Sequence, residues 1–148
     1  WCAQHDETTL LPANARAYEL ASLSGQESAG IVLFLMSLSK PSPEIIKAVD
    51  SAVKWFEKTK ITGYRVEWFV NADGKKDKRL VEDANAAPIW ARFMELADNT
   101  PFFCDRDGIK KPSMADIGFE RRAGYQWYDT SANDAIAKYP QWQQKNAK

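Results

Sequence analysis

The spacing of apolar residues predicts a helix over residues 27–38. Its apolar side chains recur three or four positions apart, which places them on one face: Ile31, Phe34, Leu35 and Leu38. Pro41 ends the pattern, because proline has no backbone N–H with which to continue a helix. We therefore expect a helix that packs this apolar face against the core.

Two further helices have clear start signals. Ser42 is a favourable N-cap and Pro43 suits a first turn, so a helix is predicted over residues 43–58. Its apolar positions again share one face: Ile45, Val49, Ala52, Val53 and Phe56. Ser131 caps a short last helix, which we expect to end at Tyr139 because Pro140 follows.

Strand-like alternation of apolar and polar residues begins after Gly63. In residues 64–70 one face carries Tyr64, Val66, Trp68 and Val70. A charged loop is expected from residue 71 to Arg79, with its lysines in solvent. Residues 89–96 alternate again and place on one face Trp90, Arg92, Met94 and Leu96. Residues 102–107 place Phe102, Cys104 and Arg106 together, before a turn at Gly108.

These elements predict an α+β, helix-rich fold in a single domain over residues 1–148, with an irregular opening segment. No apolar run approaches the ~20 residues that span a bilayer, so no membrane partner is expected. Lys plus Arg and Asp plus Glu each number 20. A nucleic-acid partner is not expected either, because such binders carry an excess of base. Any anion site must therefore be local.

The two cysteines, Cys2 and Cys104, leave two interpretations open. They form a disulfide that closes a long loop, or they are two buried free thiols. Their spacing matches neither a metal site nor a redox pair, so no metal ligand is predicted.

Three arginines lie in segments rich in aromatic and apolar residues: Arg16, Arg92 and Arg106. A guanidinium held among such side chains can donate two parallel hydrogen bonds to one carboxylate or phosphate group. This geometry favours an acidic sugar polymer as ligand. Each arginine also has a structural alternative. Arg92 could pair with Glu95 or Glu120, Arg106 with Asp105 or Asp107, and Arg16 could be a hydrogen-bonding hub. His5, the single histidine, is more typical of a structural residue than of a general base.

Several long segments, in order along the chain, resemble the C-terminal part of polysaccharide lyase family 10, the pectate lyases. They read WCAQHDETTLLPANARAYELASLSGQESAGIV, KPSPEIIKAVDSAVKWF, KITGYRVE, PIWARF, PFFCDRDGIKK and IGFERRAGYQWY. The resemblance implies the C-terminal half of a catalytic domain, with the remnant of a helical toroid plus short β-strands. It also implies a secreted, extracellular bacterial protein that acts in plant cell wall degradation. Family members cleave polygalacturonate by β-elimination with calcium.

The resemblance assigns roles residue by residue. Arg16 matches the arginine thought to take the C5 proton, while Arg92 and Arg106 match arginines that hold galacturonate carboxylates. Arg121 and Arg122 lie in a matching segment and are further candidates for substrate binding. The calcium ligands of the family lie in an N-terminal part that no segment here replaces, so no cofactor is expected in this chain and calcium is expected for the complete lyase.

Two functions follow from these assignments. We expect a non-catalytic module, derived from a lyase, that binds pectate through an arginine-lined cleft and in which the base position of Arg16 is vestigial. The alternative is a catalytic pectate lyase of which this chain is one part. The expected partner is a pectic polysaccharide, with other modules of a larger secreted protein as further candidates.

Overall fold

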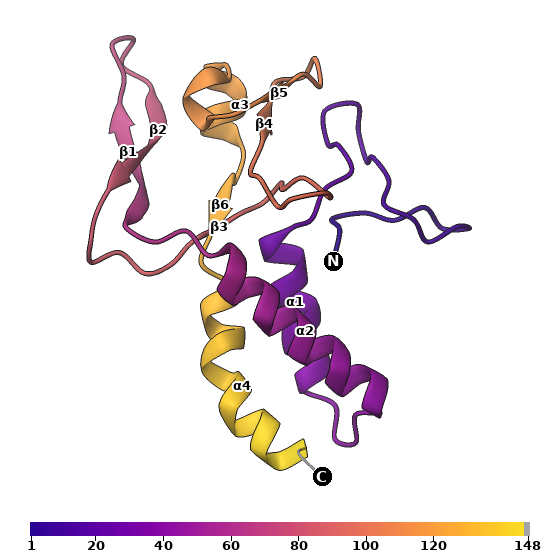
Figure 1. The fold of residues 1–148 in the computed structure, drawn as a ribbon. Helices are drawn as coiled ribbons and strands as arrows, with labels where there is room; N and C mark the ends of the chain where they lie inside the picture. The colour runs from indigo at the N-terminus through magenta and orange to yellow at the C-terminus, as the bar shows by residue number, and fades with distance from the viewer. Residues whose placement is uncertain (147–148) are drawn as a thin grey trace.

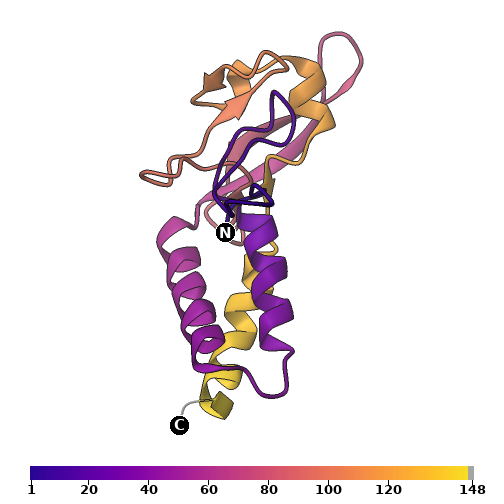
Figure 2. The same ribbon diagram turned by 90° about the vertical axis from the view of Figure 1, so that its right-hand side faces the viewer.

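The computed structural model describes residues 1–146 and confirms an α+β chain. Three helices lie side by side in one half of the molecule, namely α1 (Gly25–Met36), α2 (Pro43–Thr59) and α4 (Ala132–Asn146) (Figures 1 and 2). The other half contains the short strands, one small helix and the irregular N-terminal segment (Figure 1). Among the described residues, no helix has both the length and the apolar character needed to cross a bilayer.

Three small antiparallel pairs build the second half. The pairs are β1 (Tyr64–Val70) with β2 (Lys76–Glu82), β3 (Trp90–Ala91) with β6 (Tyr128–Asp129), and β4 (Phe103–Cys104) with β5 (Lys110–Lys111). The 3-10 turn η1 (Met114–Asp116) and the helix α3 (Phe119–Gly124) follow β5. The three segments predicted from alternation therefore contain strands, but only residues 64–70 form a long one, β1, whereas β3 and β4 have two residues each.

Residues 89–96 lie between two separate cores. Trp90 and Met94 belong to the core among the three helices, and the Trp90 indole donates to the Phe56 carbonyl at 3.0 Å. Phe93 belongs to the second core, which lies in the strand-containing half and also includes Phe102 and other buried residues. The expected common face therefore holds for Trp90 and Met94, whereas Leu96 is exposed.

The predicted core face of the first helix is only partly confirmed, because Leu35 packs against the helical core but Phe34 does not. Phe34 is 64% exposed, whereas the fully buried residues of α1 are Gly25, Ser28, Ala29 and Val32. These small residues allow close approach, and a Cβ at Gly25 would lie 2.6 Å from Cβ of Trp90. Because α1 is apolar nearly all round, its apolar spacing did not determine which face is buried.

The second helix begins where its sequence signals predict, whereas the predicted end of the last helix is wrong. Ser42 Oγ accepts from the backbone N–H of Ile45, at 3.4 Å, and α2 extends one residue beyond the predicted end. In contrast, α4 passes through Pro140 and continues to Asn146. Burial of Trp142 against the other helices offsets the single backbone hydrogen bond that a proline removes.

The charged segment after β1 is mostly strand and not loop. Only residues 71–75 turn, and Lys76–Glu82 pairs with β1 along its whole length. Charged side chains can occupy a two-stranded hairpin because ion pairs such as that of Arg79 with Glu67 form across it. The two cysteines are both buried free thiols, so the disulfide interpretation is wrong.

Candidate functional site

The ring of Tyr18 is the meeting point of three arginines from distant parts of the chain. The guanidinium carbons of Arg16, Arg106 and Arg121 lie 5.4, 5.1 and 4.8 Å from the centre of this ring. Arg106 also donates from Nη1 to the Tyr18 hydroxyl, at 3.1 Å. Cation–π attraction and hydrogen bonding thus hold the guanidinium groups around one half-buried aromatic side chain.

The loop that carries Arg16 is held by its own backbone and by a neighbouring turn. Within it, the Glu19 N–H donates to the Arg16 carbonyl and the Ala15 N–H to the Glu19 carbonyl, both at 2.9 Å. Gly108, with φ of +71°, lies against this loop, and a Cβ there would be 2.7 Å from the Ala17 carbonyl oxygen. A glycine is therefore required where the turn of Arg106 meets the loop of Arg16.

Arg121 is a buried cation beneath this surface. Its side chain comes from α3 and the residue is 5% exposed. The guanidinium lies over three rings: Tyr18, Tyr125 at 4.4 Å and Trp127 at 5.0 Å. Nε donates to the Cys104 carbonyl at 3.3 Å, and Nη2 has no partner among the described residues. This position lets Arg121 fix both tyrosines, while direct contact with a ligand stays a prediction.

Tyr125 connects Arg92 to the same surface. The Arg92 guanidinium lies 4.8 Å from the Tyr125 ring centre. Both residues line a pocket of about 80 Å³, together with Glu19, Glu27 and Phe93. The Tyr125 hydroxyl donates to Glu19 at 3.3 Å. Two tyrosines therefore connect Arg16, Arg92 and Arg106 at the surface with the buried Arg121 beneath them.

Arg16, Arg92 and Arg106 each have an acidic partner. Arg16 and Arg106 form two-point pairs with Glu19 and Glu120, at 2.7–2.8 Å and 2.7–3.0 Å. Arg92 donates to Glu27 at 2.8 Å. The partners therefore differ from the sequence alternatives, which named Glu95, Glu120, Asp105 and Asp107 for Arg92 and Arg106.

These pairs are open to competition by an external carboxylate. The side chains of Arg16 and Arg106 are 63% and 60% exposed, and exposed ion pairs contribute little to stability. Hydrogen bonds from Arg16 and Arg106 lower the pKa of Glu19 and of Glu120, so both acids are charged near neutral pH. The same pairs raise the pKa of both arginines.

Arg122 points away from the tyrosines. Its Nε and Nη2 donate to the two oxygens of Asp77, at 2.8 and 2.7 Å, and its Nη1 donates to the Ile117 carbonyl at 2.6 Å. Asp77 is 1% exposed, so this pair ties α3 to the β1–β2 hairpin from the inside. Arg122 therefore anchors the hairpin, and ligand binding by it stays a prediction.

The other polar candidates make local hydrogen bonds. His5 donates from Nδ1 to the Leu10 carbonyl at 2.8 Å, as a structural histidine does. Asp105 and Asp107 accept from the N–H groups of Gly118 and Ile109. Within residues 1–146, no three metal-binding side chains come together. The described acids therefore do not fit a calcium site.

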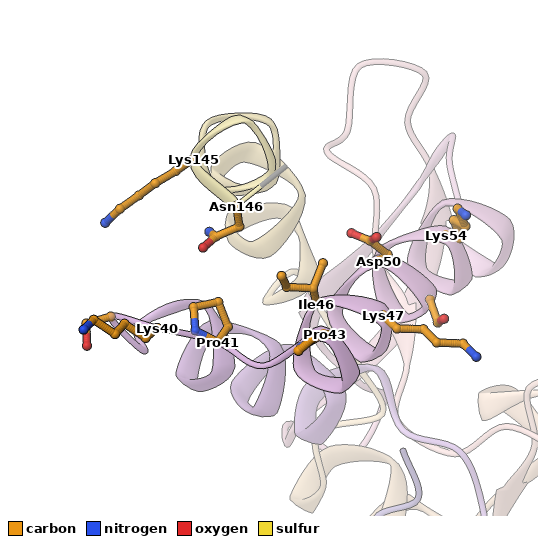
Figure 3. A pocket seen from close by; sticks show the side chains of 11 residues that line it. Lys40, Pro41, Pro43, Ile46, Lys47, Asp50, Lys54, Lys145 and Asn146 are labelled. Atoms are coloured by element: carbon orange, nitrogen blue, oxygen red, sulfur yellow. The ribbon is translucent and has the colours of Figure 1, made fainter. Parts of the chain in front are cut away.

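A larger hollow lies at the other end of the molecule, between α2 and α4 (Figure 3). It has a volume of about 800 Å³ and four lysines on its rim: Lys40, Lys47, Lys54 and Lys145. In Figure 3 the side chain of Lys47 extends to the opposite side from those of Lys40 and Lys145, with Ile46 between them. They converge on no common point, so the tyrosine–arginine surface is the stronger candidate.

Sequence reasoning found the arginines but missed the residues that organise them. Tyr18 and Tyr125 were not singled out, and neither were their acidic neighbours Glu19 and Glu27. The available signal was local, since Tyr18 and Glu19 follow Arg16 within three positions and Tyr125 follows the adjacent Arg121 and Arg122.

Comparisons with known proteins give one consistent result. Residues 1–136 match a family model described as pectic acid lyase. The solved structure of a family 10 polysaccharide lyase from Cellvibrio cellulosa is similar over 99% of this chain, with 37% identity and a TM-score of 0.79. A mutant of a family 10 lyase from the same organism, in complex with trigalacturonic acid, is similar over 98%, with the same identity and TM-score. The chain spans 43% of the length of either lyase. None of the curated proteins matches it.

Proposed function

The chain belongs to the pectic acid lyase family, and on that premise we propose that it binds pectate through Arg16, Arg92 and Arg106. One observation carries the proposal: three guanidinium groups from separate segments meet around Tyr18 and Tyr125. The ligand is demethylated homogalacturonan, a polymer with one carboxylate on each sugar. Its repeating carboxylates can each accept hydrogen bonds from one of the guanidinium groups that the protein holds in place.

Binding exchanges one carboxylate for another. In the free protein Glu19, Glu27 and Glu120 satisfy the arginines. A galacturonate that replaces one of these acids leaves no guanidinium unpaired, so the exchange avoids the main cost of desolvating a cation. Several such exchanges along one polymer act together, because the linked sugars raise the effective concentration of each next carboxylate.

The geometry supports binding without turnover better than catalysis. β-Elimination removes the C5 proton of a galacturonate, which requires a base. Arg16, at the position of the family's base, is 63% exposed and donates two hydrogen bonds to Glu19, so its guanidinium is a paired cation and not a base. The described acids also do not fit the calcium site that is expected for the complete lyase. We therefore propose a non-catalytic, secreted protein that binds pectate. Its three-helix half corresponds to part of a helical toroid.

The second candidate is a catalytic pectate lyase of which this chain forms one part. The similarity to the Cellvibrio lyase, at 37% identity, favours it. In that case residues other than those described here supply the calcium ligands.

One preparation distinguishes the candidates. The protein in its full natural length is titrated with polygalacturonate by calorimetry, and the same solution is then incubated with calcium while ultraviolet absorbance is recorded. Binding without absorbance supports the module, whereas rising absorbance from unsaturated products supports the lyase. No heat of binding and no absorbance would overturn both candidates.

A further inference from the structure

One face of the β1–β2 hairpin is aromatic and cationic. Trp68 is 57% exposed on it, and Tyr64 and Val70 of the same strand are exposed as well. The register places Lys78 opposite Trp68 and Lys76 opposite Val70, so both lysines share this face. Lys78 Nζ lies 4.7 Å from the centre of the Trp68 ring.

The opposite face of the hairpin is electrically balanced. There Glu67 pairs with both Arg65 and Arg79, and Arg65 also pairs with Asp83. In contrast, Lys76 and Lys78 have no acidic partner within residues 1–146. The single acid on the Trp68 face, Glu82, is opposite Tyr64 at the far end. The part near the turn therefore combines an open indole with uncompensated positive charge.

This face is joined to the arginine surface by direct contacts. Lys78 donates from Nζ to the Tyr125 carbonyl at 2.7 Å, and the Tyr125 ring lies beneath Arg92. The buried pair of Arg122 with Asp77 fixes the hairpin against α3, beside which it stands (Figure 1). Tyr125 therefore links Lys78 of the hairpin to Arg92 of the arginine surface.

We propose that Trp68, Lys78 and Lys76 form an outer subsite for a further galacturonate of the chain bound at the arginines, an inference that rests on the proposed function. The C–H face of the sugar packs on the exposed part of the indole, which the Lys78 ammonium does not cover. Its carboxylate accepts from Lys78, whose ammonium keeps two N–H donors beyond the one given to Tyr125. Charge complementarity selects a uronate over a neutral sugar.

The test compares ligand lengths by calorimetry, with trigalacturonate and octagalacturonate as probes. Trp68→Ala should weaken octagalacturonate binding roughly five- to tenfold and leave trigalacturonate binding within about twofold. Trp68→Phe should recover most of the loss. Phe34→Ala is the matched control, because it removes another exposed aromatic, on α1, and should change neither affinity. Unchanged thermal unfolding of Trp68→Ala shows that the fold is retained.

The charge is tested in the same way. Lys76→Ala should weaken only octagalacturonate binding, whereas Arg79→Ala removes the same charge from the same strand on the balanced face and should have no effect. Wild-type affinity of Trp68→Ala for octagalacturonate would overturn the subsite and leave the proposed function intact. An equal loss for both oligomers would also overturn it, because the subsite would not be an outer one. Failure of the wild type to bind either oligomer would instead overturn the proposed function.

Discussion

Arg92 donates to Glu27 across 2.8 Å, between a segment that follows β3 and the first turn of α1, while its guanidinium rests on the ring of Tyr125. Glu27 also accepts from Ser24 Oγ, which holds the carboxylate in place. Under the proposed function this acid competes with a ligand carboxylate for Arg92, so its removal is expected to change the affinity.

Glu27→Gln should raise the affinity for polygalacturonate about threefold. The amide keeps the hydrogen bond from Ser24 but no longer attracts Arg92 as a charge, so the guanidinium is released at lower cost. Calorimetric titration measures the change. Glu57→Gln is the control, because it removes the same charge from the exposed pair with Lys60 on α2. A lower affinity of Glu27→Gln would show that Glu27 assists binding and does not compete with it.

Arg92→Ala and Arg106→Ala should each weaken polygalacturonate binding by roughly 1.5–3 kcal/mol, as expected for a lost charge-assisted hydrogen bond. Arg106→Lys should recover only part of the loss, since lysine keeps the charge but not the planar fork. Affinity electrophoresis in a pectate gel detects these losses as faster migration. Wild-type retardation of both alanine variants would place the binding surface elsewhere.

Gly108→Ala should destabilise the protein by roughly 1–3 kcal/mol and weaken pectate binding, because the methyl group displaces the loop of Arg16. Gly74→Ala is a matched control: φ is +74° there, but a Cβ meets nothing within 4 Å. The control should lose stability through backbone strain alone and keep its affinity. Denaturant unfolding and calorimetry measure both quantities. Equal affinities of the two variants would contradict a role of Gly108 in positioning Arg16.

Stability should fall as pH is lowered below about 4, in part through Asp77. Hydrogen bonds from Arg122 hold the pKa of Asp77 below its ordinary value of 3.8. A carboxyl with a lower pKa in the folded state stabilises the fold above its unfolded pKa, and this contribution is lost as pH falls through the folded pKa. Asp77→Asn should therefore flatten the acid side of the stability profile, measured by urea unfolding. An unchanged slope would exclude Asp77 as a source of this dependence.

Much of the local structure could be predicted because its causes lie close together in the sequence. Ser42 and Pro43 specify the start of α2, and the alternation of residues 64–70 predicts the bounds that β1 has in the structure. The segments around Arg16, Arg92 and Arg106 also identified the side chains that meet around Tyr18 and Tyr125. Their proposed roles stay predictions.

The predictions failed where contacts between residues far apart in the sequence determine the local structure. The apolar surface of α1 left its buried face open, and contact with Trp90 selected the small residues around Gly25. Pro140 signals a helix end, yet burial of Trp142 carries α4 onward. The charges of Lys76 and Arg79 are typical of a loop, but pairing with β1 makes this segment a strand.

By itself the sequence determined the family, the cap of the second helix and the identity of the arginines, because these depend on residue type and on neighbours along the chain. Only the tertiary structure decided which acid each arginine faces and that Tyr18 gathers three of them. Such partners are up to about a hundred positions apart, as Glu19 and Tyr125 are, and packing of the two cores brings them together.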